Sequence, residues 1–255
     1  MQAVEAWDKS VTEHGAVWSA AGVRSDDPFI KFPEWFWPYI PESGTIVDVG
    51  CGYGRVAVPI LRAKPALCLI GLDVSVEMLA RFDQITKDHG VAERAKRMLA
   101  NMPPIPLDDA SADLIFTSAV LLHNPHDVAR EMIREMHRIL KPGGKALFTA
   151  SFPARWNLEG LQNYIAQVLI PSLRRKNGPA RTYSRAMVRE ALADFEHIEI
   201  FTVNATVLPR SVWKWPMPGQ KLIRRLNAVA ARHDLIRFLF AREFEAVAIK
   251  APAPR

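Results

Sequence analysis

A short glycine-rich turn at residues 47–55, V-D-V-G-C-G-Y-G-R, constrains the fold of this chain most strongly. An apolar run ends just before the glycines, and a helical pattern over residues 56–63 begins just after them. Glycine adopts the positive φ angles that tight turns require, and it lets a ligand approach the backbone closely. The turn therefore predicts a strand–turn–helix unit with a ligand site at the carboxyl end of its strand.

The spacing of the glycines argues against two common nucleotide motifs. A dinucleotide fingerprint, G-x-G-x-x-G, needs a glycine at position 55, where this chain has Arg55. The phosphate-binding loop is excluded because no Gly-Lys-Ser/Thr follows the turn. Nineteen residues after Gly54, Asp73 ends a second apolar run, and a carboxylate there can accept hydrogen bonds from both hydroxyls of a ribose. The glycine turn and Asp73 together predict a nucleoside site. The alternative is that the glycines only form a strand-to-helix turn and that Asp73 caps the next helix.

Apolar runs and helical patterns alternate along the chain, which predicts a parallel, doubly wound α/β sheet. The predicted strands of the first part are residues 45–49, 67–72, 97–99, 114–121 and 145–150, and the predicted helices are residues 56–63, 76–87 and 125–140. The second part has predicted helices at residues 158–173, 184–192 and 220–240, and predicted strands at residues 198–203 and 244–249.

Composition supports one cytoplasmic α/β domain spanning residues 1–255. No apolar run reaches the roughly 20 residues that span a bilayer, and Cys51 and Cys68 have no metal-ligand spacing. The net charge of +6 is uneven, because residues 171–255 carry a balance of +9 and residues 1–170 carry −3. The basic C-terminal third of the chain can bind an anionic partner such as nucleic acid or a lipid head group. The alternative is that its charges only form a solvated surface.

The segments around these motifs resemble the class I S-adenosylmethionine-dependent methyltransferases over about residues 40–150. The resemblance is carried by VDVGCGYGR, LDVSVEML, NMPPIPLDDASADLIFTSAVLLH and LKPGGKALFTASF. It implies a Rossmann-like, seven-stranded sheet whose last strand is antiparallel, and S-adenosyl-L-methionine as the cofactor. It also implies an N-terminal helical lid (residues 1–40), a cofactor-binding core (41–151) and a substrate side (152–255) that holds a helical cap (204–240).

The resemblance also implies which residues bind the cofactor. Asp48 would orient the methionine amino group, Asp73 would bind the ribose, and Asn101 would meet the adenine amino group, although the family often has Asp there. The methionine part of the cofactor would contact Gly50, Cys51, Gly52 and Gly54. The adenine ring would contact Val74 and Met102. From the fourth strand, the methionine end would be approached by Ser118 and Ala119.

His123 is the candidate general base, because it follows the fourth strand and imidazole accepts a proton near neutral pH. A structural histidine is the alternative. Tyr53 reads as a lid over the cofactor, and Arg55 can meet an anionic group of cofactor or substrate, or a surface acid. No Asn-Pro-Pro-Tyr, Pro-Cys or metal-binding cluster is found, so the prediction is methyl transfer to an oxygen, in preference to a nitrogen, without a metal.

The acceptor and the oligomeric state are not readable from the sequence. Residues 211–240 place Trp213, Trp215 and several basic residues beside an amphipathic helix, which can contact a membrane surface, roof a pocket for a small or lipid-linked acceptor, or pack on its own sheet. RNA methylation and a non-catalytic, cofactor-binding subunit are the alternative functions. The sequence argues against nucleic acid as a partner, because no RNA-binding module is recognisable.

Overall fold

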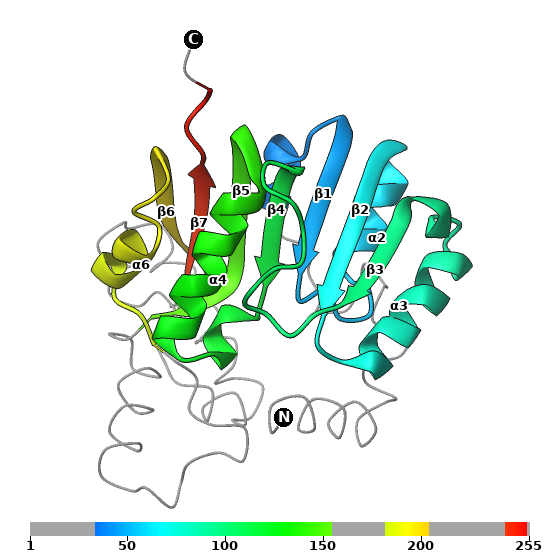
Figure 1. The fold of residues 1–255 in the computed structure, drawn as a ribbon, viewed down its shortest axis with the longest axis horizontal. Coiled ribbons are helices and arrows are strands. Elements are labelled where there is room, and N and C mark those ends of the chain that lie inside the picture. The colour runs from blue at the N-terminus through cyan, green and yellow to red at the C-terminus, as the bar shows by residue number, and fades with distance from the viewer. Residues whose placement is uncertain (1–33, 155–181, 204–242, 254–255) are drawn as a thin grey trace, which may run out of the picture.

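The computed structural model describes residues 34–154, 182–203 and 243–253. Within these ranges one mixed sheet has the strand order β3-β2-β1-β4-β5-β7-β6 (Figure 1). β7 runs antiparallel to β5 and β6, and the other neighbours are parallel. This confirms the predicted Rossmann-like sheet. The strands are β1 (Ser43–Val49), β2 (Ala66–Asp73), β3 (Ala95–Leu99), β4 (Ala112–Ser118), β5 (Leu140–Pro153), β6 (His197–Val203) and β7 (Glu243–Ile249).

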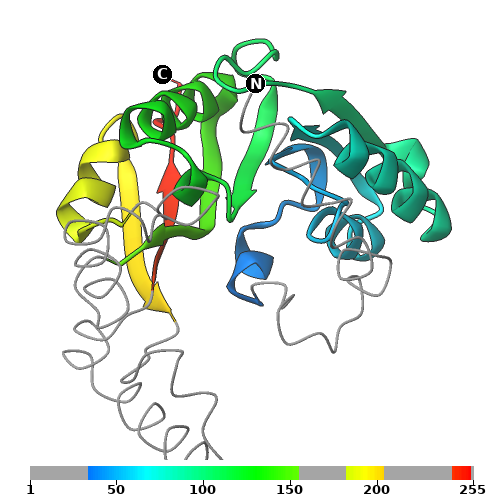
Figure 2. The same ribbon diagram turned by 90° about the horizontal axis from the view of Figure 1, so that it is seen from below.

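Helices cover both faces of the sheet. The helix η2 and the helices α2 and α3 pack with one apolar cluster, and α4 and α6 pack with a second cluster on the other face (Figure 2). The largest fully buried side chains include Phe36 of η2, Phe82 of α3 and Phe116 of β4. The helical elements are η2 (Glu34–Tyr39), α2 (Ala57–Ala63), α3 (Val76–Asp88), η3 (Ala92–Arg94), η4 (Leu121–His123), α4 (His126–Ile139) and α6 (Arg185–Ala191).

The start of α3 shows how the local sequence sets an element. Ser75 is the N-cap, and its Oγ accepts a hydrogen bond from the backbone N–H of Met78 at 3.2 Å. Such a cap satisfies one of the amides that lack a partner in the first turn of a helix. Met78 and Leu79 are then buried. A serine followed by an apolar first turn is therefore a local sequence pattern that sets the start of this helix.

Two strands have boundaries that differ from the prediction. The strand predicted over residues 114–121 ends at Ser118, because Ala119 has a φ of 60° and the chain turns into η4. The strand predicted over residues 145–150 is longer, since β5 already pairs with β4 at Leu140 and still pairs with β7 at Pro153. The Lys-Pro-Gly-Gly segment, residues 141–144, therefore lies in β5, and α4 ends at Ile139, directly before this strand. Pairing with distant strands fixed both ends of β5.

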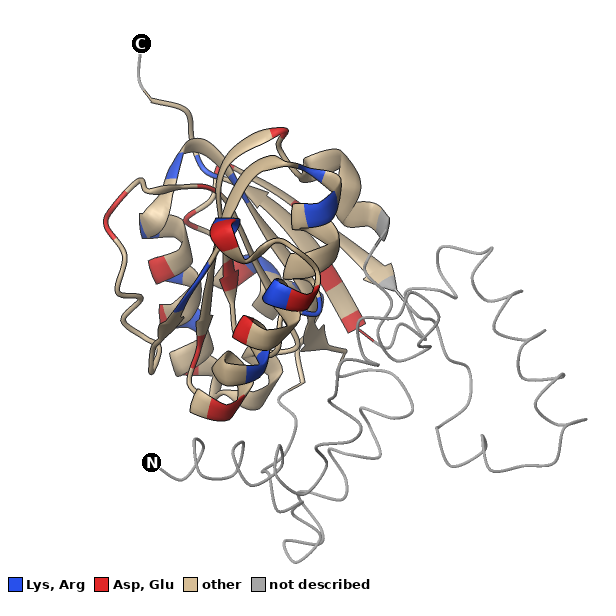
Figure 3. Cartoon of the chain, turned by 90° about the vertical axis from the view of Figure 1, so that its right-hand side faces the viewer, with Lys and Arg blue, Asp and Glu red and all other residues tan. Residues whose placement is uncertain are grey.

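The predicted lid and cap fall largely outside the described residues. Of the N-terminal lead-in only residues 34–40 are described, and they form η2 and its end; the helices predicted at 158–173 and 220–240 and the cap at 204–240 are not covered. The basic surplus lies mostly there too, because the described residues 182–203 and 243–253 carry three Lys or Arg and six Asp or Glu. On the described helices the two signs are interspersed (Figure 3). Within the described ranges, no helix has the length and apolar character to cross a bilayer.

A buried glutamate ties η2 to the sheet. Glu245 of β7 is 5% exposed, and its carboxylate accepts hydrogen bonds from the indole N–H of Trp35 and the hydroxyl of Thr149. The backbone N–H of Ala150 donates to it at 3.4 Å. Burial raises the pKa of Glu245, Glu243 raises it further, and the bonds from Thr149 and Trp35 oppose the rise.

This raised pKa predicts a pH-dependent contribution to stability. The folded chain binds the Glu245 proton more tightly than the unfolded chain. The contribution of Glu245 to the free energy of unfolding therefore falls as pH rises from about 4.3 towards the raised pKa. Glu245→Gln does not titrate. We therefore expect the variant to gain free energy of unfolding relative to wild type as pH increases over this window, measured by urea denaturation at a series of pH values. A difference that stays constant with pH would contradict the prediction.

Candidate functional site

A cavity of about 310 Å³ opens where β1, β2 and β4 end. Parallel strands bring their carboxyl ends to one edge of a sheet, and ligands of open α/β folds bind there. Eleven of the twelve residues predicted for the site line this cavity: Asp48, Gly50, Cys51, Gly52, Asp73, Val74, Asn101, Met102, Ser118, Ala119 and His123. Gly54 does not.

The glycine turn is anchored to β2 by its backbone. The N–H groups of Gly50 and Cys51 both donate to the carbonyl oxygen of Leu72, at 2.7 and 2.9 Å. Gly50 and Gly52 have φ angles of 78° and 53°, which side chains rarely adopt. A Cβ on Gly52 would meet nothing nearer than the Met78 sulfur at 4.0 Å, so it would project into the cavity. The turn thus exposes bare backbone to a ligand.

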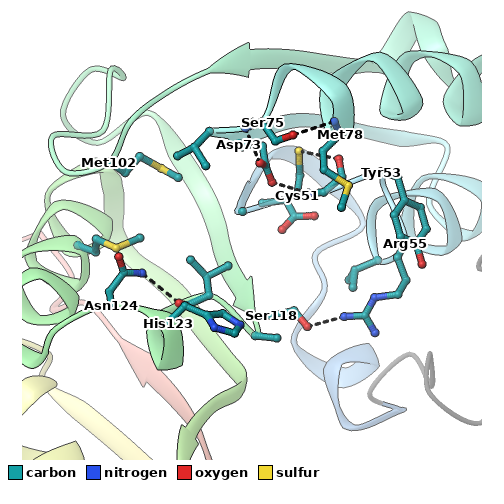
Figure 4. A pocket seen from close by; sticks show the side chains of 18 of the residues that line it. Cys51, Tyr53, Arg55, Asp73, Ser75, Met78, Met102, Ser118, His123 and Asn124 are labelled. Atoms are coloured by element: carbon teal, nitrogen blue, oxygen red, sulfur yellow. Dashed lines mark hydrogen bonds between the residues drawn. The ribbon is translucent and has the colours of Figure 1, made fainter. Parts of the chain in front are cut away.

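Asp73, at the end of β2, is held by two backbone amides. Its Oδ2 accepts from the N–H of Gly52 at 2.8 Å, and its Oδ1 accepts from the N–H of Ser75 at 2.9 Å. These bonds fix the carboxylate between the glycine turn and the start of α3 (Figure 4). Each carboxylate oxygen has a second acceptor site, so both can also accept from ligand hydroxyls. Asp73 therefore both braces the turn and offers an acceptor pair.

Asp48 is the most buried acid of the cavity. It is the next-to-last residue of β1 and is 2% exposed. Burial raises its pKa well above the usual range, Arg55 opposes this shift, and Asp73 adds to it. Burial also raises the pKa of the neighbouring Cys51 thiol, with further contributions from Asp48 and Asp73. A buried acid with these surroundings favours a cationic ligand group, because such a group would stabilise the charged carboxylate.

The other ends of the cavity differ in polarity. Val74, Asn101 and Met102 line the end beside β3, where Met102 is buried and Asn101 is exposed. Ser118 and Ala119 line the end beside β4, and His123 follows on η4. Figure 4 shows the His123 ring turned towards the cavity, on the side of Ser118. Burial lowers the pKa of His123, so its imidazole is neutral at neutral pH.

Gly54 is placed differently from the prediction. A Cβ there would lie 3.1 Å from the ring of Phe82, and its φ is 87°. The residue therefore lets the turn pack against α3. The sequence did not point to several residues that also line the cavity, namely Val56, Ser75, Met78, Val120, Asn124 and Met132. Met132 had a usable signal, because it lies four residues from both Val128 and Met136 on the apolar stripe of α4.

Part of the chain is similar in sequence to known proteins. Residues 46–144 match the family model described as Methyltransferase domain. The chain is 30% identical over 137 residues to dimethylglycine N-methyltransferase of Parasynechococcus marenigrum, covering 52% of this chain and 47% of that protein. It is 31% identical over 114 residues to malonyl-[acyl-carrier protein] O-methyltransferase of a Marinomonas species, covering 42% and 38%. It is 36% identical over 107 residues to a ubiquinone/menaquinone biosynthesis C-methyltransferase of Geotalea uraniireducens, covering 42% and 45%.

The chain thus spans less than half the length of these relatives. Among solved structures, geranyl diphosphate C-methyltransferase of Streptomyces coelicolor, in a complex with S-adenosyl-L-homocysteine, has a TM-score of 0.54 at 18% identity and covers 85% of this chain and 75% of that one. The comparisons thus agree with the sheet order: residues 46–144 are similar to a methyltransferase domain, and the chain has the fold of solved methyltransferase structures.

Proposed function

We propose that the chain transfers a methyl group from S-adenosyl-L-methionine to an oxygen, in preference to a nitrogen, of a small-molecule or lipid-linked metabolite. The observation that carries the choice of oxygen is His123, a neutral imidazole at the cavity beside Ser118. The relatives include N-, O- and C-methyltransferases by name, so they support methyl transfer and leave the acceptor atom to the site itself.

The residues of the cavity fit the cofactor. Gly52 leaves space where a side chain would project, and Asp73 presents two acceptor oxygens that suit a ribose. Asp48 is a buried acid suited to an ammonium group, and Val74 and Met102 provide apolar surface for an adenine ring. Bound there, the cofactor supplies an electrophilic methyl group on sulfur, whose displacement requires an in-line nucleophile and a site protected from water. Met78, Met102 and Val56 contribute to that protection.

His123 explains why an oxygen acceptor is favoured. A hydroxyl group holds its proton at neutral pH and needs a base to become a strong nucleophile, whereas a neutral amine already carries a lone pair. Among the described residues, His123 is the histidine that lines the cavity. Its lowered pKa keeps it in the proton-accepting form below the pH at which an exposed histidine would be protonated.

His123→Gln is expected to lower turnover about 100- to 10,000-fold, because that is the usual contribution of a positioned general base. Binding of the cofactor should remain. In the wild-type enzyme the rate should fall only as pH drops through the lowered pKa of His123, below about 6.5, and the variant should lose this limb. The measurement is the transfer of labelled methyl to a hydroxyl acceptor from pH 5 to 8, as bounded by the usual histidine range.

A neighbouring histidine provides the control. His126 begins α4, its Nε2 lies 3.2 Å from the carbonyl oxygen of Thr182, and it does not line the cavity. His126→Gln should keep the wild-type pH profile. Screening labelled cofactor against hydroxyl metabolites, amines and RNA tests the acceptor class. Transfer to amines or RNA alone, or His123→Gln with near-normal turnover, would reject the oxygen proposal; binding of cofactor with transfer to none would favour a non-catalytic subunit.

A further inference from the structure

Arg138, near the end of α4, uses every N–H donor of its guanidinium inside the protein. Its partners lie on residues 100–111, the loop that joins β3 to β4 beside α4 (Figure 1), and on the preceding turn of α4 itself. The bonds run from the Nη atoms to the carbonyl oxygens of Ile105 and Leu107 (2.9 Å each) and to carboxylate oxygens of Asp109 (2.5 Å) and Glu135 (2.9 Å), and from Nε to Glu135 (3.0 Å). Arginine has five N–H donors, so the group is saturated and its position is fixed.

Glu135 completes the attachment of the loop to α4. Its Oε2 accepts a hydrogen bond from the backbone N–H of Ile105 at 3.0 Å. The N–H and the carbonyl oxygen of Ile105 are therefore both bonded to side chains of α4. The Ile105 side chain is 2% exposed and belongs to the same apolar cluster as Met132 and Met136 of that helix. Polar and apolar contacts thus hold this loop residue in one place.

The stretch between this attachment and the sheet forms a wall of the cavity. At its other end the N–H of Ala100 donates to the carbonyl oxygen of Asp73, the last residue of β2, at 2.9 Å. Of the residues in between, Asn101 and Met102 line the cavity, and two prolines follow them (Figure 4). Proline fixes φ near about −65°. Few backbone torsions are then free to absorb a shift of Ile105, so such a shift would move the wall.

Under the proposed function this end of the cavity binds the adenine ring. We propose that Arg138 is a positioning residue for the purine: it holds the wall of Asn101 and Met102 in its binding geometry from outside the cavity. Arg138 itself does not line the cavity and acts only through the loop. The inference rests on the proposed function, because the ligand is the same cofactor.

Two ligands that differ only at the purine test this role. S-Adenosylhomocysteine carries an exocyclic amine, and S-inosylhomocysteine carries a carbonyl oxygen in its place. The amide oxygen of Asn101 can accept a hydrogen bond from the amine and none from the carbonyl oxygen. Wild type should therefore bind S-adenosylhomocysteine about 10-fold more tightly, which corresponds to one net hydrogen bond.

Arg138→Gln should remove this selectivity. Without the guanidinium, the carbonyl oxygens of Ile105 and Leu107 lose their partner, and the wall is released from α4. The variant should bind S-adenosylhomocysteine about 10-fold more weakly than wild type, because the purine loses its hydrogen bond. It should bind S-inosylhomocysteine within about twofold of wild type, because that ligand never had the bond. Calorimetric titration measures both affinities.

Three variants serve as controls. Arg134→Gln removes an arginine one turn earlier on α4, which is 67% exposed and lies 4.0 Å from Asp194, and it should keep the wild-type selectivity. Asp109→Asn removes a partner that is 78% exposed and should also keep it, because exposed ion pairs contribute little. Arg138→Lys keeps the charge with three donors in place of five, so its selectivity should be intermediate.

The affinity ratio separates positioning from a merely structural role. If Arg138 served only stability, its loss would lower the free energy of unfolding, and the two affinities would change by the same factor. Urea denaturation of each variant supplies the stability. If Arg138→Gln does not unfold cooperatively, Arg138→Lys carries the same comparison, with a partial loss of selectivity expected.

The outcomes also distinguish this inference from the proposed function. Failure of the wild-type chain to bind S-adenosylhomocysteine would overturn both. Equal binding of the two ligands by wild type would overturn the positioning role and leave methyl transfer standing. The same holds if Arg138→Gln keeps the wild-type selectivity, or if Arg134→Gln loses it to the same extent.

Discussion

Asp73→Ala is expected to weaken binding of S-adenosylmethionine at least about 100-fold, because the substitution removes two charge-assisted hydrogen bonds of about 1.5–3 kcal/mol each. The ligand would lose both ribose acceptors. The protein would lose the bonds from Gly52 and Ser75 that hold the glycine turn beside α3. Calorimetric titration of wild type and variant measures the effect. Asp73→Asn keeps one acceptor oxygen and should be intermediate.

Asp83→Ala is the matched control for this prediction. Asp83 lies on α3 and pairs with Arg97 at 2.6 Å, with 38% of its side chain exposed. Exposed ion pairs contribute about 0–1 kcal/mol, and the residue does not line the cavity. Its removal should leave ligand binding unchanged. If Asp73→Ala bound the cofactor as Asp83→Ala does, the ribose assignment would be wrong, and Asp73 would only brace the turn.

Gly50→Ala is expected to destabilise the protein and to close part of the site. Gly50 has a φ of 78°, and an added Cβ would lie 2.2 Å from Cγ2 of Val120, which lines the cavity. The valine cannot easily rotate away, because its branched Cβ is stiff at χ1. The left-handed backbone alone costs an alanine about 1–2 kcal/mol. The clash adds to this cost, and relieving it must move Val120 or the turn.

Gly143→Ala isolates the backbone term. Gly143 has a φ of 76°, and an added Cβ would meet nothing within 4 Å. This variant should lose about 1–2 kcal/mol of unfolding free energy and should bind the cofactor normally. Urea denaturation and calorimetric titration of both variants compare them. Equal losses of stability, with binding intact in Gly50→Ala, would show that the turn and Val120 adapt without consequence for the site.

The acids of the site could be predicted because their signals are local. Asp48 is the next-to-last residue of one short apolar run and Asp73 ends another, and the glycines between them mark a turn within a few residues. Parallel strands then bring both acids to the same edge of the sheet. The alternation of helices and strands likewise identified the fold, and the predicted strand 67–72 lies within β2.

Other features had no local signal. Ala119 and Ala150 have φ angles of 60° and 47°, and alanine does not announce a left-handed backbone as glycine does. The end of β4 was therefore predicted too late in the chain. Trp35 and Glu245 are 210 residues apart, and Arg55 and Ser118 are 63 apart. Each of these contacts depends on which strands are neighbours and in which register they pair.

The sequence by itself determined the described α-helices and strands, apart from the ends of β4 and β5, together with the glycine turn and the two acids of the cavity, because apolar periodicity and turn chemistry act over a few residues. Only the tertiary structure decided that Gly54 packs on Phe82, that Met132 reaches the cavity, and that Arg55 turns inward to Ser118. The physical reason is that a side chain's partners are set by the packing of elements distant in the chain. The sequence showed a charged residue at position 55, and the fold decided which way it points.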